Sequence, residues 1–197
     1  MDSPFMTRAA RSLAGSGARV ARFEFPYMGS RRAGGGRKMP DREPVLRQSW
    51  LDAIDLVRGA RSLFIGGKSL GGRIASMVAD EARVDGVVCL GYPFHPPGRP
   101  DRLRTAHLES ITRPTLIVQG TRDAFGVRAE VEEYRLSPRV RIYWIEDGDH
   151  SWKPSARSGR SEADNFAEGM QAVRAFLNLE GPPVRREDGG AADGSTI

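Results

Sequence analysis

The chain has 197 residues, of which 39% are hydrophobic and 28% charged, as in an ordinary soluble globular domain. No apolar run is long enough to cross a bilayer, and the first residues lack the basic start and apolar stretch of a signal peptide. The single cysteine, Cys89, excludes an internal disulfide framework, so we expect a cytoplasmic protein. The net charge of +5 comes from scattered arginines without interleaved aromatics, which argues against nucleic acid as a partner.

The first part of the chain predicts a helix, a strand, a loop and a second helix. Ser3 and Pro4 are typical of a helix start, and apolar residues recur at helical spacing up to Leu13. Residues 18–25 predict a strand, because apolar and charged side chains alternate there. Residues 26–43 are rich in Gly, Arg and Pro and predict a long loop, after which Pro44 opens a helix.

Further along, short apolar strands alternate with helices. The patterns predict strands at residues 62–66, 84–90, 115–118 and 140–145, and helices at residues 70–81, 105–110, 128–136 and 161–179. Such alternation is typical of an α/β fold with a mainly parallel sheet. We expect one domain over residues 1–180 and a disordered tail over residues 181–197, whose Gly-, Pro- and charge-rich composition offers little to bury.

The strongest chemical motif is Gly67-Lys68-Ser69-Leu70-Gly71, directly after an apolar strand and before a helix. A nucleophile at such a turn has a strained backbone, and glycines two residues before and after it are expected to prevent clashes. The strand–turn–helix context makes this GxSxG match far more specific than the pattern alone. A Gly-rich tight turn with an idle serine is the alternative.

A serine nucleophile needs a histidine base that is oriented by a carboxylate. His150 follows the strand at residues 140–145, and Asp123 follows the strand at residues 115–118, so both are expected above the strand ends. Asp123 has an alternative role as a helix cap paired with Arg122. Asp149 and Asp147 lie on the same short loop as His150 and are poorly placed to orient it.

The remaining candidates favour ordinary structural roles. His95 is expected to pack in a loop or line a pocket, and His107 to be a surface or satisfied core residue. Cys89 lies in an apolar run and is expected in the core. No pair of His or Cys residues has the spacing of metal ligands, so we expect no metal site.

Four motifs together resemble a dienelactone-hydrolase-like branch of the α/β hydrolases, which includes a testis-expressed hydrolase-like protein and a subunit of a chromatin-modifying complex. The resemblance covers nearly the whole chain except the tail. It implies the same triad of Ser69, Asp123 and His150. The motifs are Gly67-Lys68-Ser69-Leu70-Gly71-Gly72-Arg73, Leu90-Gly91-Tyr92-Pro93-Phe94-His95-Pro96-Pro97-Gly98, Gln119-Gly120-Thr121-Arg122-Asp123 and Gly148-Asp149-His150-Ser151-Trp152.

The chain departs from this family pattern at its beginning. Relatives have a strand and a His-Gly-Ala-Gly-type loop just before the segment that matches residues 1–6. The resemblance implies that this strand lies between those at residues 18–25 and 62–66, and that its loop gives one of two oxyanion-hole N–H groups. The other comes from Leu70. We therefore expect Met1 to be an internal methionine of a longer protein, and loss of the loop donor to cost about 2.7–4 kcal/mol in the transition state.

These observations lead to two functional hypotheses. The first is hydrolysis of a carboxylic ester, thioester or lactone, a small-molecule substrate, through an acyl-enzyme on Ser69, without a cofactor. Its apolar acyl pocket is expected to be lined by Tyr92, Phe94, His95 and Trp152. The second is a non-catalytic α/β-hydrolase fold that serves as a binding module or scaffold.

Overall fold

The centre of the protein is a four-stranded parallel sheet. The computed structural model describes residues 3–32, 34, 39–57 and 59–179. The strands lie in the order β1-β2-β3-β4, and all three pairings are parallel. Their carboxyl ends therefore share one edge of the sheet, where the loops that follow them meet. The strands are β1 (Phe64–Lys68), β2 (Gly86–Leu90), β3 (Thr115–Gly120) and β4 (Val140–Ile145).

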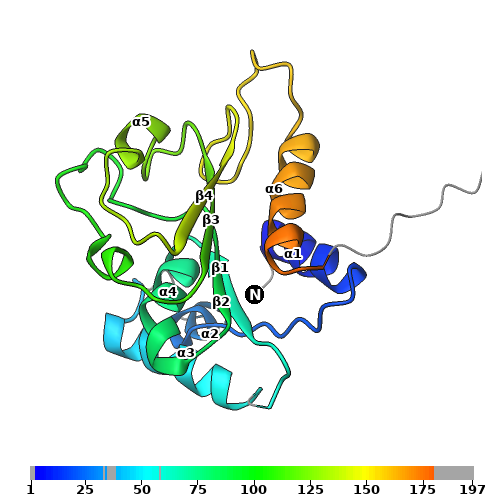
Figure 1. Cartoon of the computed structure of the whole chain (residues 1–197), viewed down its shortest axis with the longest axis vertical. Coiled ribbons are helices and arrows are strands. Elements are labelled where there is room, and N and C mark those ends of the chain that lie inside the picture. Colours follow the sequence, from blue (N-terminus) through cyan, green and yellow to red (C-terminus); the bar gives the residue numbers. More distant parts are fainter. Residues whose placement is uncertain (1–2, 33, 35–38, 58, 180–197) are drawn as a thin grey trace, which may run out of the picture.

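Helices cover both faces of this sheet (Figure 1). On one face α4 (Leu70–Ala82) packs on β1 and β2 and is itself covered by α3 (Glu43–Asp55). On the other face α6 (Glu162–Phe176) packs on β3 and β4, with α1 (Pro4–Gly15) beside it. Among the described residues, none of the helices has the length and hydropathy that crossing a bilayer requires.

The two faces of the sheet carry two separate hydrophobic clusters. Successive side chains of a strand point to opposite faces, so β2 supplies Val87 and Cys89 to one cluster and Val88 and Leu90 to the other. Every residue of β2 and β3 is buried, which explains why these strands have continuous rather than alternating apolar patterns. The expectation that Cys89 lies in the core is confirmed, because its side chain has no exposed surface.

The N-terminal part confirms two predicted helices and corrects two other predictions. The helices α1 and α3 begin at Pro4 and Glu43, within a residue of the expected starts. Residues 18–25 do not form a strand, because within the described part of the chain they join no ladder: β1 is an edge strand and pairs there only with β2. The predicted loop at residues 26–43 contains a short helix, α2 (Pro26–Arg32).

Later elements match the expected order with smaller differences. The helix predicted at residues 128–136 is a single turn, α5 (Arg128–Val131), and the short helix expected near residue 105 is the 3-10 turn η1 (Ala106–Glu109). The helix α6 has a capping box, in which the Ser161 hydroxyl accepts from the Asp164 N–H at 3.0 Å. The tail predicted at residues 181–197 lies outside the described residues.

Truncation in the middle of the sheet should be costly for stability. Ile117 of β3 is completely buried, so we expect Ile117→Ala to lower the free energy of unfolding by about 2–5 kcal/mol, measured by urea denaturation. Leu56 is 88% exposed, and Leu56→Ala should change it by less than about 0.5 kcal/mol. Equal losses in the two variants would contradict this assignment of the core.

Candidate active site

Ser69 occupies a strained turn between β1 and α4. Its backbone has φ 52° and ψ −118°, a region that a residue with a side chain rarely adopts. Its main-chain N–H donates to the carbonyls of Gly91 at 3.1 Å and Leu90 at 3.3 Å, which ties the turn to the end of β2. Although Ser69 is the N-cap residue of α4, its hydroxyl makes no capping hydrogen bond. The hydroxyl is therefore held at the strand ends without being used to start the helix.

The glycines around Ser69 allow this close packing, but not all in the expected way. A Cβ on Gly72 would lie 2.5 Å from the Gly67 carbonyl oxygen, and a Cβ on Gly67 would lie 3.1 Å from the Gly71 carbonyl carbon. A Cβ on Gly71 would meet nothing within 4 Å. A side chain at Gly71, two residues after the serine, would therefore meet no neighbour. A side chain at Gly72 would collide with the strand, so Gly72 is the glycine that this packing requires.

Asp123 and His150 meet above the ends of β3 and β4. The Nδ1 of His150 lies 2.7 Å from Oδ2 of Asp123, so the ring donates to the carboxylate through Nδ1. Asp123 is completely buried, whereas the His150 side chain is 22% exposed. The ring of Phe125 lies against the imidazole with centroids 4.3 Å apart. This arrangement leaves Nε2 as the nitrogen that is able to accept a proton.

The structure also shows a buried polar residue that the sequence reading did not single out. Gln119 donates from Nε2 to Oδ2 of Asp123 at 2.9 Å, and its Oε1 accepts from the Tyr92 N–H at 2.7 Å. Oδ1 of Asp123 accepts from the Phe125 N–H at 2.9 Å. The carboxylate therefore has three donors and a fixed orientation. The available signal was a glutamine at the end of an otherwise apolar strand, four residues before the aspartate.

Gly91 is the common neighbour of Ser69 and His150. Its carbonyl accepts from Ser69, and a Cβ added to it would lie 2.8 Å from the His150 carbonyl oxygen and 3.3 Å from Nδ1. The structure thus brings Ser69, Asp123 and His150 to one edge of the sheet. Among the hydrogen bonds of the described residues, none joins Ser69 to His150. Such bonds are often long in a free enzyme and shorten when substrate binds.

The neighbouring charged residues have other partners. Arg122 pairs with Asp147, with Nε 2.7 Å from Oδ1, rather than with Asp123. Asp149 accepts from the main-chain N–H groups of Ser151 and Lys153 and so shapes the loop. The residue that caps α5 is Val127, so the alternative role of Asp123 as its cap has no support.

The ring nitrogens of the other two histidines lie near other groups. His95 is 3% exposed, and its ring nitrogens lie 2.8 Å from the Pro96 carbonyl and 3.2 Å from Oε2 of Glu130. His107 has Nε2 2.9 Å from the hydroxyl of Ser76. Burial and the nearby Arg73 guanidinium lower the pKa of His107 to about 4. Among the described residues, no group of three His, Cys, Asp or Glu side chains is arranged to hold a metal ion.

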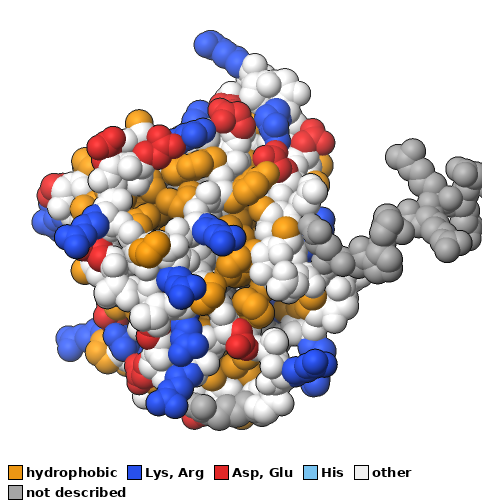
Figure 2. Space-filling view, viewed as in Figure 1, with side chains coloured by type: hydrophobic (Ala, Val, Ile, Leu, Met, Phe, Trp, Pro, Cys, Tyr) orange, Lys and Arg blue, Asp and Glu red, His pale blue; other side chains and the backbone are white. Residues whose placement is uncertain are grey.

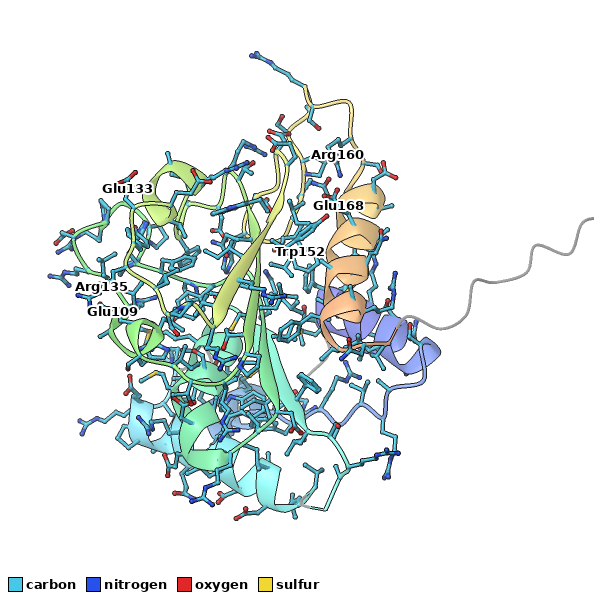
Figure 3. The ribbon with its side chains drawn as sticks, viewed as in Figure 1. Glu109, Glu133, Arg135, Trp152, Arg160 and Glu168 are labelled. Carbon is cyan, nitrogen blue, oxygen red and sulfur yellow. The ribbon has the colours of Figure 1, made fainter. Side chains whose placement is uncertain are left out.

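The four residues expected to line an acyl pocket do not form a common wall. Tyr92 and Phe94 belong to the cluster beneath α4, whereas Trp152 lies on the opposite face of the sheet, between the strands and α6 (Figure 3). All three, with His95, are at most 3% exposed and serve as packing. Large aromatic residues after the end of a strand can either pack in the core or line a pocket, and in this protein they pack in the core.

Leu70, the expected oxyanion donor, is the first residue of α4. The N–H groups in the first turn of a helix have no partner within the helix and carry partial positive charge. The turn at Ser69 therefore sets its hydroxyl directly before an anion-stabilising helix end.

A family model described as an alpha/beta hydrolase domain matches residues 1–178, so the chain belongs to that family. An α/β serine hydrolase without a lid from Xanthomonas campestris has a TM-score of 0.67 and 21% identity, covering 92% of this chain and 77% of that one. A serine hydrolase homologue from Coxiella burnetii has a TM-score of 0.66 and 18% identity, covering 91% and 78%.

An esterase domain from Rhodothermus marinus is also similar, with a TM-score of 0.59, 17% identity, and coverage of 88% of this chain and 79% of that one. At these identities the structural likeness establishes a shared fold. The α/β-hydrolase fold expected from the sequence is thereby confirmed.

Replacing Gln119 tests its role beside Asp123. Gln119→Met would leave the Tyr92 N–H without its acceptor and Asp123 without one donor, so we expect unfolding to be easier by about 1–3 kcal/mol. Labelling of Ser69 by a fluorophosphonate should slow at least about tenfold. Thr115→Val, at the far end of the same strand, is the matched control and should leave labelling unchanged. Equal labelling rates in both variants would count against an orienting role.

Stability should depend on pH through His107. Because its folded pKa of about 4 lies below the ordinary 6.5, the neutral ring stabilises the fold above pH 6.5, and this contribution is lost as the pH falls toward 4. Between pH 7.5 and 4.5 the wild type should lose about 2 kcal/mol more unfolding free energy than His107→Gln in urea titrations. Parallel losses would show that the ring is not buried in its neutral form.

Proposed function

We propose that the protein hydrolyses small carboxylic esters, or related thioesters or lactones, through an acyl-enzyme on Ser69. One observation carries the proposal. Ser69 has φ 52°, and its hydroxyl makes no helix-capping hydrogen bond. It lies at the same edge of the sheet as the hydrogen-bonded pair of His150 and Asp123, whose Nδ1 and Oδ2 are 2.7 Å apart. A turn with a purely structural role does not require a serine in a strained backbone conformation. Nor does it require a completely buried carboxylate that is hydrogen-bonded to a partly exposed histidine.

Each residue has a definite step in this reaction. Nε2 of His150 takes the proton of Ser69 as the hydroxyl attacks the acyl carbon, and then gives it to the leaving group. Asp123 holds the ring by Nδ1 and stabilises the imidazolium. The Leu70 N–H donates to the oxyanion. Water, deprotonated by His150, then attacks the acyl carbon; the bond from that carbon to the Ser69 oxygen breaks, and His150 returns the proton to Ser69 as the acid leaves.

The substrate class rests on resemblance and on the chemistry of the site. The motifs around Ser69, Tyr92, Asp123 and His150 support a place in the dienelactone-hydrolase-like branch, whose substrates are ester-type. The esterase domain from Rhodothermus marinus shares the fold, which is compatible with this choice. Thioesters and lactones pass through the same tetrahedral oxyanion, so the same residues serve for them.

Two serine variants test the proposal. Ser69→Ala should abolish fluorophosphonate labelling and lower kcat for a p-nitrophenyl ester at least about a thousandfold, since it removes the nucleophile. The control is Ser76→Ala, because Ser76 lies 2.9 Å from a histidine ring but is only 3% exposed. That variant should keep full labelling. Turnover that persists in Ser69→Ala would overturn the proposal, and absence of turnover and labelling in the wild type would favour a non-catalytic scaffold.

A further inference from the structure

Lys68 connects the nucleophile strand to the loop that carries the histidine. It is the last residue of β1 and directly precedes Ser69. Its Nζ donates to the main-chain carbonyl oxygen of His150 at 2.5 Å, across 82 residues of sequence. The side chain thus runs from the turn that sets Ser69 to the backbone of the residue expected to take its proton. No step of the reaction described above uses this contact.

Gly91, the residue after β2, lies near the same carbonyl. A Cβ on Gly91 would lie 2.8 Å from the His150 oxygen, so a side chain at this position would collide with it. Gly91 has φ +72°, a conformation that favours glycine. The His150 carbonyl therefore accepts from Lys68 and leaves no room for a side chain at Gly91. Both residues also adjoin Ser69: Lys68 precedes it in the chain, and the Gly91 carbonyl accepts from its N–H at 3.1 Å.

The surroundings of Lys68 show that its amino group is kept at this place. The Nζ lies 4.7 Å from the ring centroid of Phe5, a residue of α1. Burial lowers its pKa to about 8, and the carboxylates of Asp123 and Asp149 oppose that effect. A partly buried amino group needs hydrogen-bond acceptors in place of water, and the His150 carbonyl is the acceptor that the structure provides.

We propose that Lys68 is a positioning residue for His150, an inference that rests on the proposed hydrolase function. The bond from Nδ1 to Asp123 fixes one end of the imidazole, but the ring can still pivot about it. The bond from Lys68 fixes the main chain of the same residue. Together they determine where Nε2 lies relative to the Ser69 hydroxyl. A displacement of about 1 Å in such a geometry can cost on the order of a hundredfold in rate.

The test compares variants of Lys68 in the full chain. Lys68→Met keeps the length and apolar contacts of the stem but removes the donor, and it should lower kcat about 10- to 100-fold while KM for a p-nitrophenyl ester changes less than about twofold. Lys68→Arg retains a donor and should recover at least about a third of the lost factor. Lys153→Met is the matched control, since this exposed lysine follows His150 by three residues, and it should match the wild type.

A second measurement separates this proposal from the proposed function. In Lys68→Met the imidazole NMR signals of His150 should shift or broaden, whereas those of His95 and His107 stay unchanged. If the wild type proves inactive, this signal still reports on positioning. Should Lys68→Met be unfolded by circular dichroism, Lys68→Leu, which also lacks a donor, takes its place in both measurements.

Three results would overturn the inference. The first is an unchanged kcat together with unchanged His150 signals. The second is a raised KM with the wild-type kcat, which would make Lys68 a substrate-binding residue. The third is a folded Lys68→Arg that is as impaired as Lys68→Met, which would show that the donor is not what matters.

Discussion

The turn from β1 into α4 is the constraint on which the rest of the site depends. Ser69 has a positive φ, and the glycines at positions 67 and 72 let strand and helix approach closely around it. The main-chain bond from Ser69 to Gly91 anchors the strained turn to β2. Strain of this kind persists where surrounding contacts determine the backbone, and here a sheet with helices on both faces supplies them (Figure 1).

The parallel sheet brings the other residues of the candidate site to the same edge as Ser69. Each strand ends at the same edge, so Asp123 after β3 and the loop of His150 after β4 meet beside the turn after β1. Hydrophobic side chains also lie near the middle of the face shown in Figure 2, with charged side chains most numerous around its rim. Arg160, just before α6, forms an ion pair with Glu168 of that helix (Figure 3).

Sequence reasoning succeeded where one local rule determined the outcome. A buried parallel strand followed by a Gly-rich turn and a helix is a pattern of neighbours, so the position of Ser69 at the β1–α4 turn could be predicted. The prediction of a strand at residues 18–25 was wrong, because a strand also needs a neighbouring strand to pair with, and the alternation of side chains does not show whether one is present. The expected pocket failed for a related reason: the face of the sheet on which Trp152 lies depends on the loop backbone, not on residue type.

The polar contacts of the site were the least predictable from the sequence. The partner of Arg122 proved to be Asp147, and Gln119 supports Asp123 from within β3, because side-chain pairing is decided by a fraction of an ångström in three dimensions. The link from Lys68 to His150 spans 82 residues of sequence. Its donor lies inside the GxSxG motif, at the position that the pattern leaves open.

The packing of Trp152 makes the thermal stability of the candidate site depend on α6. This residue lies two positions after His150, has φ 67°, and places its ring so tightly against α6 that a Cβ on Gly169 would lie 2.6 Å from it. Phe5 of α1 also packs against the indole, with ring centroids 4.9 Å apart. If α6 frays on warming, the histidine loop loses its anchor while the strands that hold Ser69 and Asp123 remain paired. Thermal inactivation would then precede melting of the sheet, and the temperature range of function would be set by α6 and α1.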